Sequence, residues 1–291
     1  MKNWVSATRL ERPIFWLGLA IVVAAAASAQ QLATRTGQIE HDVVSAYSHI
    51  RVRKDASTRT LLFVRDNGEE VVESKVDLKR PQRLLVDYTQ YMFLSYAHRP
   101  EQRKVLIVGL GGGGMIHFLK HHDPQVAVDV VEIDPAIVKV ADQFFQVRSE
   151  GNVKIITADG VDYLSTTTER YDVIYMDAFL KPSAATDVNG VPLAAKTAEF
   201  YQQVQQKLTP GGLVVFNLNP HDGTRQDIET IAQVFRQTYV YRVPVGGFVA
   251  VGTGEARRET LPAIRRLANA ADRRLKTNFL GSHAGQLIQQ P

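Results

Sequence analysis

The chain has 291 residues, of which 45% are hydrophobic and 22% are charged, and its formal net charge is +4. This many apolar residues can bury a core, which excludes a wholly disordered protein, and the length fits one large α/β domain with an appendage or two small domains. Because the sequence contains no cysteine, disulfide frameworks, zinc–thiolate sites and thiol nucleophiles are excluded.

Residues 1–29 have the pattern of an export signal. Three basic residues precede an apolar run, Ile14–Ala27, which ends at the small residues Ala27, Ser28 and Ala29. This order is typical of a cleavable signal peptide, and the run is short for a transmembrane helix, which needs about 20 residues. An uncleaved N-terminal anchor and a buried helix are the alternatives. We expect export to the periplasm or the medium, or, with an anchor, a position close to the membrane.

Most of the positive charge lies near the two ends of the chain. Residues 1–29 hold three basic residues against one acidic residue, and residues 255–276 hold seven against three. The rest of the chain therefore has a net charge of −2, which does not favour a nucleic-acid partner. Residues 256–291 predict a basic C-terminal helix and tail. Its amphipathic helix runs from Arg257 to about Leu275, with the arginine pairs on a solvated face or, alternatively, on a membrane or partner surface.

Residues 30–80 predict a small β module. Alternating polar and apolar runs predict strands at His49–Val52, Thr58–Val64 and Glu69–Glu73, and Asp66-Asn67-Gly68 predicts a hairpin turn. The next segment, residues 82–98, predicts a helix with one apolar face.

Residues 81–255 predict a Rossmann-like domain, because strands and helices alternate. Strands are expected at Val105–Val108, Val126–Ile133, Val153–Ile156, Val173–Met176 and Leu213–Phe216, and helices at 114–121, 135–145, 160–167 and 195–208. This alternation indicates βαβ units and a doubly wound parallel sheet with both faces covered, so the fold class is α/β. Two further strands, near Tyr239–Val243 and Phe248–Val251, are expected to close the sheet, with Gly246-Gly247 as their turn.

A glycine cluster follows the first of these strands, in the run VLIVGLGGGG from Val105. Gly109 and Gly111 allow a tight turn and bring backbone N–H groups against a ligand, at the positive N-terminus of the next helix. The alternative is that these glycines serve only the close packing of the strand and the helix.

Acidic residues follow the next two strands. Glu132 and Asp134 come at the end of the second strand, where an acidic side chain can accept hydrogen bonds from the hydroxyls of a ribose. Asp134 precedes Pro135 and can instead cap the next helix, which leaves Glu132 as the ribose ligand. Asp159, followed by Gly160, comes after the third strand. It can accept a hydrogen bond from the exocyclic amine of a purine, or cap the helix that follows.

Asp177 ends the fourth strand, at the edge of the sheet where ligands of open α/β folds bind. A carboxylate there can act as a general base or hold a cation, and the alternative is a loop cap. Asn217, Asn219 and His221 follow the fifth strand and fall along the same cleft without an assigned role. Because four features fall at successive strand ends, we expect one site.

Several motifs occur in a fixed order along roughly residues 43–252. They are YSHIRV from Tyr47, KVLIVGLGGGG from Lys104, VVEIDPAIV from Val130, ITADG from Ile156, the loop at Asp177, and GVPLAAKTAEFYQQVQQKLTPGGLVVFNLN from Gly190. With this ordered set the sequence resembles the spermidine synthase family of polyamine aminopropyltransferases. The resemblance implies the Rossmann-like fold of class I S-adenosylmethionine-dependent methyltransferases, preceded by a small β module.

The resemblance also implies how the site would be used. Gly109 and Gly111 would line a nucleoside thioether or sulfonium ligand, Glu132 would hold the ribose, and Asp159 with Gly160 would face the adenine. The ligand would be a cosubstrate, decarboxylated S-adenosylmethionine or S-adenosylmethionine itself, with no permanently bound cofactor and no metal.

The resemblance also implies a catalytic role for Asp177. It falls where the family keeps its catalytic aspartate, which accepts a proton from the attacking amine. A small amine is thus the implied acceptor, and a homodimer is the implied assembly.

Four positions depart from the family pattern. Gly112 replaces an aspartate that helps hold the aminopropyl ammonium, and Leu180 replaces a second acid that serves the acceptor. Ser48 stands where the family usually has glutamine, and Tyr91 stands where an acidic residue is expected. The nucleoside half of the site is therefore retained and the polyamine half is altered.

Three functions fit this pattern. The first is a spermidine-synthase-like enzyme that transfers an aminopropyl group to an amine, with Asp177 as general base. The second is an S-adenosylmethionine-dependent methyltransferase, which Gly112 favours and Val108 opposes, because methyltransferases commonly carry an acidic residue at that point. The third is a non-catalytic nucleoside- or polyamine-binding protein on the same fold.

Overall fold

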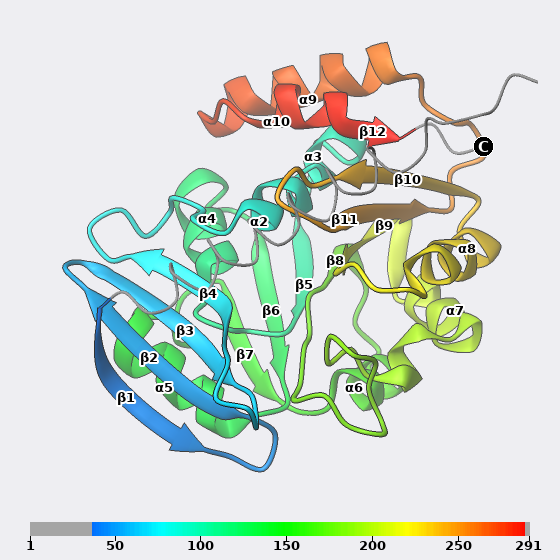
Figure 1. The fold of residues 1–291 in the computed structure, drawn as a ribbon. Coiled ribbons are helices and arrows are strands. Elements are labelled where there is room, and N and C mark those ends of the chain that lie inside the picture. The colour runs from blue at the N-terminus through cyan, green and yellow to red at the C-terminus, as the bar shows by residue number, and fades with distance from the viewer. Residues whose placement is uncertain (1–36, 289–291) are drawn as a thin grey trace, which may run out of the picture. The chain divides into compact units, whose positions relative to one another are not determined.

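A computed structural model describes residues 37–288 of the chain (Figure 1). The predicted signal peptide or anchor at residues 1–29 lies outside the described residues. Within residues 37–288, no helix is both long enough and apolar enough to cross a membrane.

The N-terminal part of the described chain forms a four-stranded antiparallel sheet, in the order β1-β2-β3-β4. Its strands are β1 (Gln38–Val44), β2 (His49–Asp55), β3 (Thr58–Val64) and β4 (Glu70–Asp77). The predicted hairpin turn lies between β3 and β4, where Gly68 has a φ of 79°. The sequence did not predict β1, because this strand is rich in polar residues and most of its side chains are exposed.

The pairing of β3 with β4 contains a bulge at Glu73. Leu61 pairs with Ser74, and the next residue, Leu62, pairs with Val72, so Glu73 is an extra residue on β4. A bulge bends its strand and redirects nearby side chains, and bulges are common next to active sites. The regular alternation expected from the sequence did not predict this change of register.

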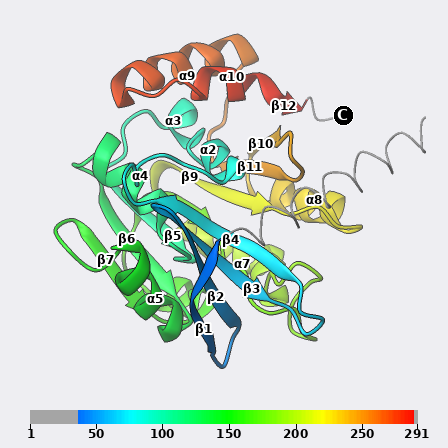
Figure 2. The ribbon, with the colours of Figure 1, turned by 60° about the vertical axis from the view of Figure 1, so that its left-hand side comes forward.

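The second sheet has eight strands, in the order β12-β10-β11-β9-β8-β5-β6-β7 (Figures 1 and 2). The strands are β5 (Lys104–Val108), β6 (Ala127–Glu132), β7 (Val153–Thr157), β8 (Tyr171–Met176), β9 (Leu208–Leu218), β10 (Gln237–Arg242), β11 (Phe248–Thr253) and β12 (Leu287–Ile288). Strands β5 to β9 pair in parallel, and β10, β11 and β12 extend the sheet in antiparallel fashion. The predicted Rossmann-like α/β fold with a small β module before it is confirmed.

Helices cover both faces of this sheet. They are α2 (Asp87–Met92), α3 (Ser95–His98), α4 (Gly114–His122), α5 (Pro135–Phe145), α6 (Gly160–Thr166), η1 (Leu193–Lys196), α7 (Ala198–Gln206), α8 (Thr224–Val234), α9 (Leu261–Leu275), α10 (Leu280–His283) and η2 (Ala284–Gln286). Alternate residues of β5 enter two separate cores. Ile107 belongs to the same core as Phe118 of α4 and Ile137 of α5, whereas Leu106 belongs to the core that contains Phe200 of α7 and Ile231 of α8.

The helix predicted at residues 82–98 is wrong in its extent. The structure has two short helices instead, α2 and α3, separated at Phe93 and Leu94. All residues from Tyr91 to Ala97 are buried. One apolar face of a continuous amphipathic helix does not bury that many consecutive side chains, so the chain turns and packs them in several directions.

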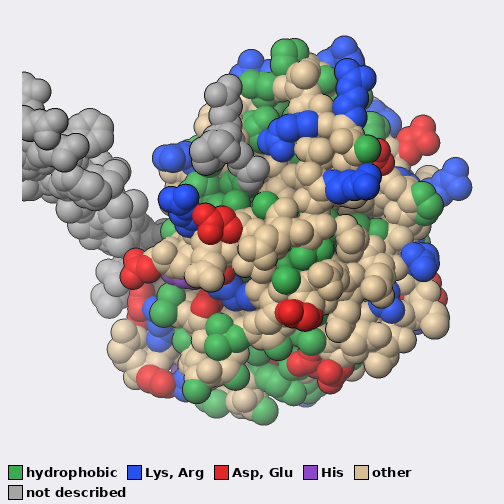
Figure 3. Space-filling view, turned by 90° about the vertical axis from the view of Figure 1, so that its right-hand side faces the viewer, with side chains coloured by type: hydrophobic (Ala, Val, Ile, Leu, Met, Phe, Trp, Pro, Cys, Tyr) green, Lys and Arg blue, Asp and Glu red, His purple; other side chains and the backbone are tan. Residues whose placement is uncertain are grey.

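Helix α9 presents its arginine pairs to solvent. Its buried side chains recur at near four-residue intervals, at Ile264, Ala268, Ala271 and Leu275, and the arginines between them are exposed. Figure 3 shows several Lys and Arg side chains at the top of the molecule, where α9 lies. The predicted amphipathic helix is present there, beginning at Leu261.

Candidate active site

One pocket contains every site residue that the sequence singled out. It lies at the carboxyl ends of β5, β6 and β8, and its lining includes Gly109, Gly111, Glu132, Asp159, Gly160 and Asp177. The strand-end rule for open α/β sheets therefore places these residues together.

Two glycines in the pocket, Gly109 after β5 and Gly160 at the start of α6, lie where any side chain would collide with neighbouring atoms. Gly109 has a φ of 100°, and a Cβ atom there would lie 2.2 Å from the carbonyl oxygen of Asp177. A Cβ atom on Gly160 would lie 2.6 Å from Cγ1 of Val108. Close packing, the alternative considered for the glycine cluster, thus accounts for Gly109, while the glycine loop after β5 still lines the pocket. The sequence did not predict the same constraint at Gly160.

Glu132 holds the glycine loop. Its Oε2 accepts a hydrogen bond from the backbone N–H of Leu110 at 2.9 Å, and its Oε1 accepts one from the N–H of Asp134 at 2.9 Å. Burial raises the pKa of Glu132, because the charged form is poorly solvated there. Each carboxylate oxygen has a second lone pair, so this arrangement leaves room for hydrogen bonds from ribose hydroxyls.

Asp134 and Asp159 cap helices, which is the alternative role that the sequence predicts for each of them. Oδ1 of Asp134 accepts a hydrogen bond from the N–H of Ala136 at 2.8 Å, at the start of α5. Oδ1 of Asp159 accepts from the N–H of Val161 at 2.7 Å, at the start of α6. Across residues 37–288 the second oxygen of Asp159 has no hydrogen-bond partner, so capping and contact with an adenine are compatible.

Asp177 is held by side chains from two other elements. Tyr88 of α2 donates a hydrogen bond to Oδ2 at 3.0 Å, and Nδ2 of Asn217 on β9 donates to Oδ1 at 2.9 Å. Burial raises the pKa of Asp177 to about 7, which these two hydrogen bonds partly oppose. A carboxylate with a pKa near 7 suits a general base at neutral pH.

Sequence reasoning missed two residues beside Asp177. The sequence pattern places Tyr88 only on the apolar face of a helix and Glu73 only at the end of a strand. Both line the pocket. Burial and the charge of Asp177 raise the pKa of Glu73 to about 8, and Arg65 partly opposes this shift. Neither residue lies at the end of a strand of the large sheet, so no local signal marked them.

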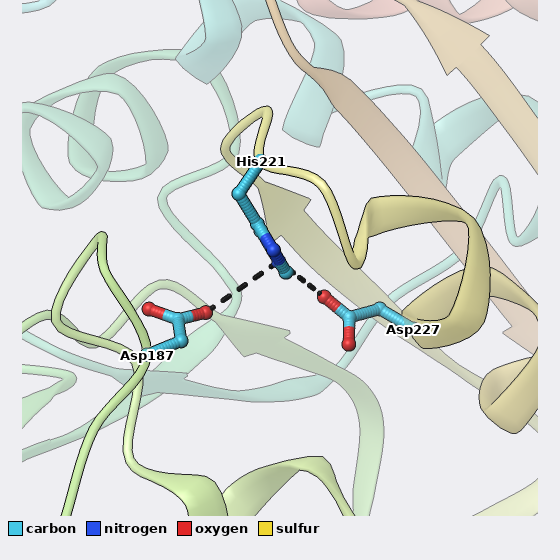
Figure 4. Close-up of side chains that lie close together, drawn as sticks. All are labelled: Asp187, His221 and Asp227. Atoms are coloured by element: carbon cyan, nitrogen blue, oxygen red, sulfur yellow. Dashed lines mark hydrogen bonds and ion pairs between the residues drawn. The ribbon is translucent and has the colours of Figure 1, made fainter. Parts of the chain in front are cut away.

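A second polar cluster lies in the same pocket, built from Asp187, His221 and Asp227 (Figure 4). These three side chains are close enough together to ligate a metal ion. The ammonium group of Lys196, however, lies 2.7 Å from Oδ2 of Asp187, 2.8 Å from Oδ2 of Asp227 and 3.2 Å from Nε2 of His221. Lys196 therefore supplies the positive charge that these carboxylates need, and a metal would have to displace it.

Comparison with known sequences gives one family match and two kinds of relative. Residues 90–250 match the Spermine/spermidine synthase domain family. A polyamine aminopropyltransferase from Vibrio vulnificus is 28% identical over 217 residues, which cover 71% of this chain and 68% of that protein. A human eEF1A lysine and N-terminal methyltransferase is 34% identical over 147 residues, which cover 48% of this chain but only 21% of that larger protein.

Comparison with solved structures gives the same fold. Spermidine synthase from Thermotoga maritima superposes with a TM-score of 0.64 and 18% identity, covering 87% of this chain and 85% of that one. At this identity the similarity concerns the fold alone.

Proposed function

The chain belongs to the spermine/spermidine synthase family, and on that premise we propose that it transfers an aminopropyl group from decarboxylated S-adenosylmethionine to an amine. Its relatives named polyamine aminopropyltransferase agree with the prediction of an enzyme of this type. The donor, the acceptor and the role of Asp177 are proposals drawn from the site.

One observation carries the proposal. The glycine loop and Asp177 are in direct contact, since a Cβ atom on Gly109 would collide with the carbonyl oxygen of Asp177. Asp177 also lines the same pocket as the loop, so a nucleoside sulfonium bound on the loop would present its reactive carbon close to the carboxylate. Proximity and alignment of the two reactants supply a large part of the rate of such a reaction.

The chemistry assigned to Asp177 is proton removal. An amine acceptor arrives as an ammonium ion, which has no free electron pair and cannot attack carbon. Asp177 accepts its proton, and the neutral nitrogen then bonds to the propyl carbon while the carbon–sulfur bond breaks and its electrons return to sulfur. The products are the aminopropylated amine and methylthioadenosine. Tyr88 and Asn217 keep the carboxylate oriented throughout.

The test is release of methylthioadenosine by purified protein incubated with decarboxylated S-adenosylmethionine and a panel of diamines and monoamines. We expect release with at least one amine. D177N should lower it by about 10²- to 10⁴-fold, the usual contribution of a general base. Absence of methylthioadenosine with every amine would leave only a methyltransferase or a binding protein.

A methyltransferase is the second candidate, favoured by the 34% identity to the human methyltransferase over 147 residues, 48% of the chain. Its donor would be S-adenosylmethionine, which carries a carboxylate that the decarboxylated donor lacks. Calorimetry with both donors separates the two functions, because a methyltransferase binds the carboxylated donor more tightly.

The predicted signal peptide or anchor adds a proposal about location. We propose that the protein acts outside the cytoplasm, where its donor would also have to be supplied. Cell fractionation of the full chain and of a variant lacking residues 1–29 tests this, and equal cytoplasmic recovery of both would contradict it.

A further inference from the structure

We propose that Glu73 is the counter-ion of the ammonium group on the donor's three-carbon chain, and that it selects a decarboxylated donor. The inference rests on the proposed function, because it names the group that a sulfonium donor would meet in this pocket.

Glu73 lies on the bulge of β4, next to the glycine loop. The extra residue redirects the strand at a point where it lies against that loop. A Cβ atom on Gly111 would lie 3.5 Å from Cβ of Ser74, the residue after Glu73, and one on Gly112 would lie 2.9 Å from Oγ of Ser74. Strand β4 therefore covers the loop on which the nucleoside would rest, and Glu73 lines the pocket at that place.

Within residues 37–288, no positively charged side chain forms an ion pair with Glu73. Its carboxylate makes no hydrogen bond in the described part of the chain either. Asp177 adds a second acidic group to the same pocket and raises the pKa of Glu73. The charge of Arg65 offsets only part of that rise. Of the lysines in the lining, Lys196 is bound by Asp187 and Asp227. Lys75 makes no ion pair within residues 37–288, and it is not among the charges that shift the pKa of Glu73.

The surroundings of Gly112, where the family's aspartate is absent, are crowded. A Cβ atom there would lie 2.8 Å from the Phe145 ring and 2.9 Å from Oγ of Ser74. An acidic side chain does not fit at that position without moving its neighbours. Glu73 supplies a carboxylate to the same pocket from the strand that covers the loop, in place of one within the loop.

Selection of the donor follows from charge. Decarboxylated S-adenosylmethionine ends in an ammonium group. This cation lowers the pKa of Glu73, so the proton held in the unliganded site is released and the resulting carboxylate accepts a charge-assisted hydrogen bond from the ammonium. S-adenosylmethionine ends in an ammonium and a carboxylate, and its own carboxylate opposes the loss of the proton from Glu73, so this donor binds the site more weakly.

The test is calorimetry of three ligands on the wild type, E73Q and the matched control E69Q. Glu69 lies before the same strand, outside the pocket lining. The ligands are decarboxylated S-adenosylmethionine, S-adenosylmethionine, and methylthioadenosine, which lacks the ammonium group. We expect E73Q to weaken the decarboxylated donor by about tenfold or more, the loss of one charge-assisted hydrogen bond. Its affinity for methylthioadenosine should stay unchanged, and its preference against S-adenosylmethionine should fall.

The outcomes separate this inference from the proposed function. Unchanged affinity of E73Q for the decarboxylated donor, with methylthioadenosine still bound, would overturn the role of Glu73 alone. Equal weakening of both ligands by E73Q would also overturn it, because it would show a structural effect. Failure of the wild type to bind methylthioadenosine would overturn the nucleoside site and the proposed function with it.

Discussion

Tyr88 donates a hydrogen bond from its hydroxyl group to Oδ2 of Asp177 over 3.0 Å. The two residues are 89 positions apart, and this bond joins α2 to the end of β8. It stabilises the charged form of the carboxylate and thereby lowers its pKa.

The first prediction concerns that bond. Y88F should raise the pH at which the transferase reaction reaches half of its maximal rate, because the pKa of Asp177 rises without the donor. The shift should be about one unit or more, since one unit corresponds to about 1.4 kcal/mol and a hydrogen bond to a charged group is worth at least that. The measurement is a pH–rate profile. Y163F, which changes a tyrosine outside the pocket lining, should leave the midpoint in place, and an unshifted midpoint in Y88F would contradict the assignment.

The second prediction concerns the contact between the glycine loop and Asp177. G109A and G246A both place a side chain at positive φ, but a Cβ atom on Gly246 would have no other atom within 4 Å. G246A should therefore cost only about 1–2 kcal/mol of backbone strain. G109A should cost at least about 2 kcal/mol more, because the Asp177 backbone must move, and it should lose activity as well. Urea unfolding of both variants measures the difference, and equal losses would refute the contact.

The third prediction concerns the pH dependence of stability. Folding raises the pKa of Glu73 from 4.5 to about 8, so the unliganded folded protein binds a proton that the unfolded chain releases. That stabilisation is complete below about pH 4.5 and is lost as the pH rises through about 8. E73Q should therefore match the wild type near pH 5 and melt several degrees higher near pH 9. Thermal unfolding at the two pH values checks this, and a constant difference would contradict it.

The fourth prediction concerns Lys196. K196M leaves Asp187 and Asp227 without their cation, and the Lys196 side chain is only 13% exposed. Breaking such a pair by removing one partner should cost about 3 kcal/mol. K181M removes a lysine that pairs with Asp66 at the surface and should cost less than about 1 kcal/mol. Chemical unfolding compares the two, and equal stability of both variants would mean that the cluster needs no internal cation.

The sequence predicted the parts of the site that follow strands of the large sheet. Buried β-branched runs mark those strands, and parallel strands carry their ligand sites at one edge, so Glu132 and Asp177 could be found from position alone. Tyr88 and Glu73 reach the same pocket from α2 and from β4. Their placement depends on packing between segments far apart in the chain and, for Glu73, on a bulge that no local pattern announces.

The prediction of one helix over residues 82–98 is wrong for a related reason. The apolar periodicity predicts one face of a single helix, whereas in the structure Tyr91 to Ala97 are all buried and the helix is interrupted at Phe93 and Leu94. The structure confirms that Asp134 and Asp159 cap helices, which the sequence can predict because capping depends only on neighbouring residues in the chain.

Mass spectrometry of the amine product tests most directly whether this protein transfers an aminopropyl group. The purified chain is incubated with an accepting amine and equal concentrations of decarboxylated S-adenosylmethionine and S-adenosylmethionine. We expect an aminopropylated amine in the wild-type reaction and a strong loss of that product in D177N. A methylated amine, or an aminopropylated amine formed equally well by D177N, would contradict the proposed function.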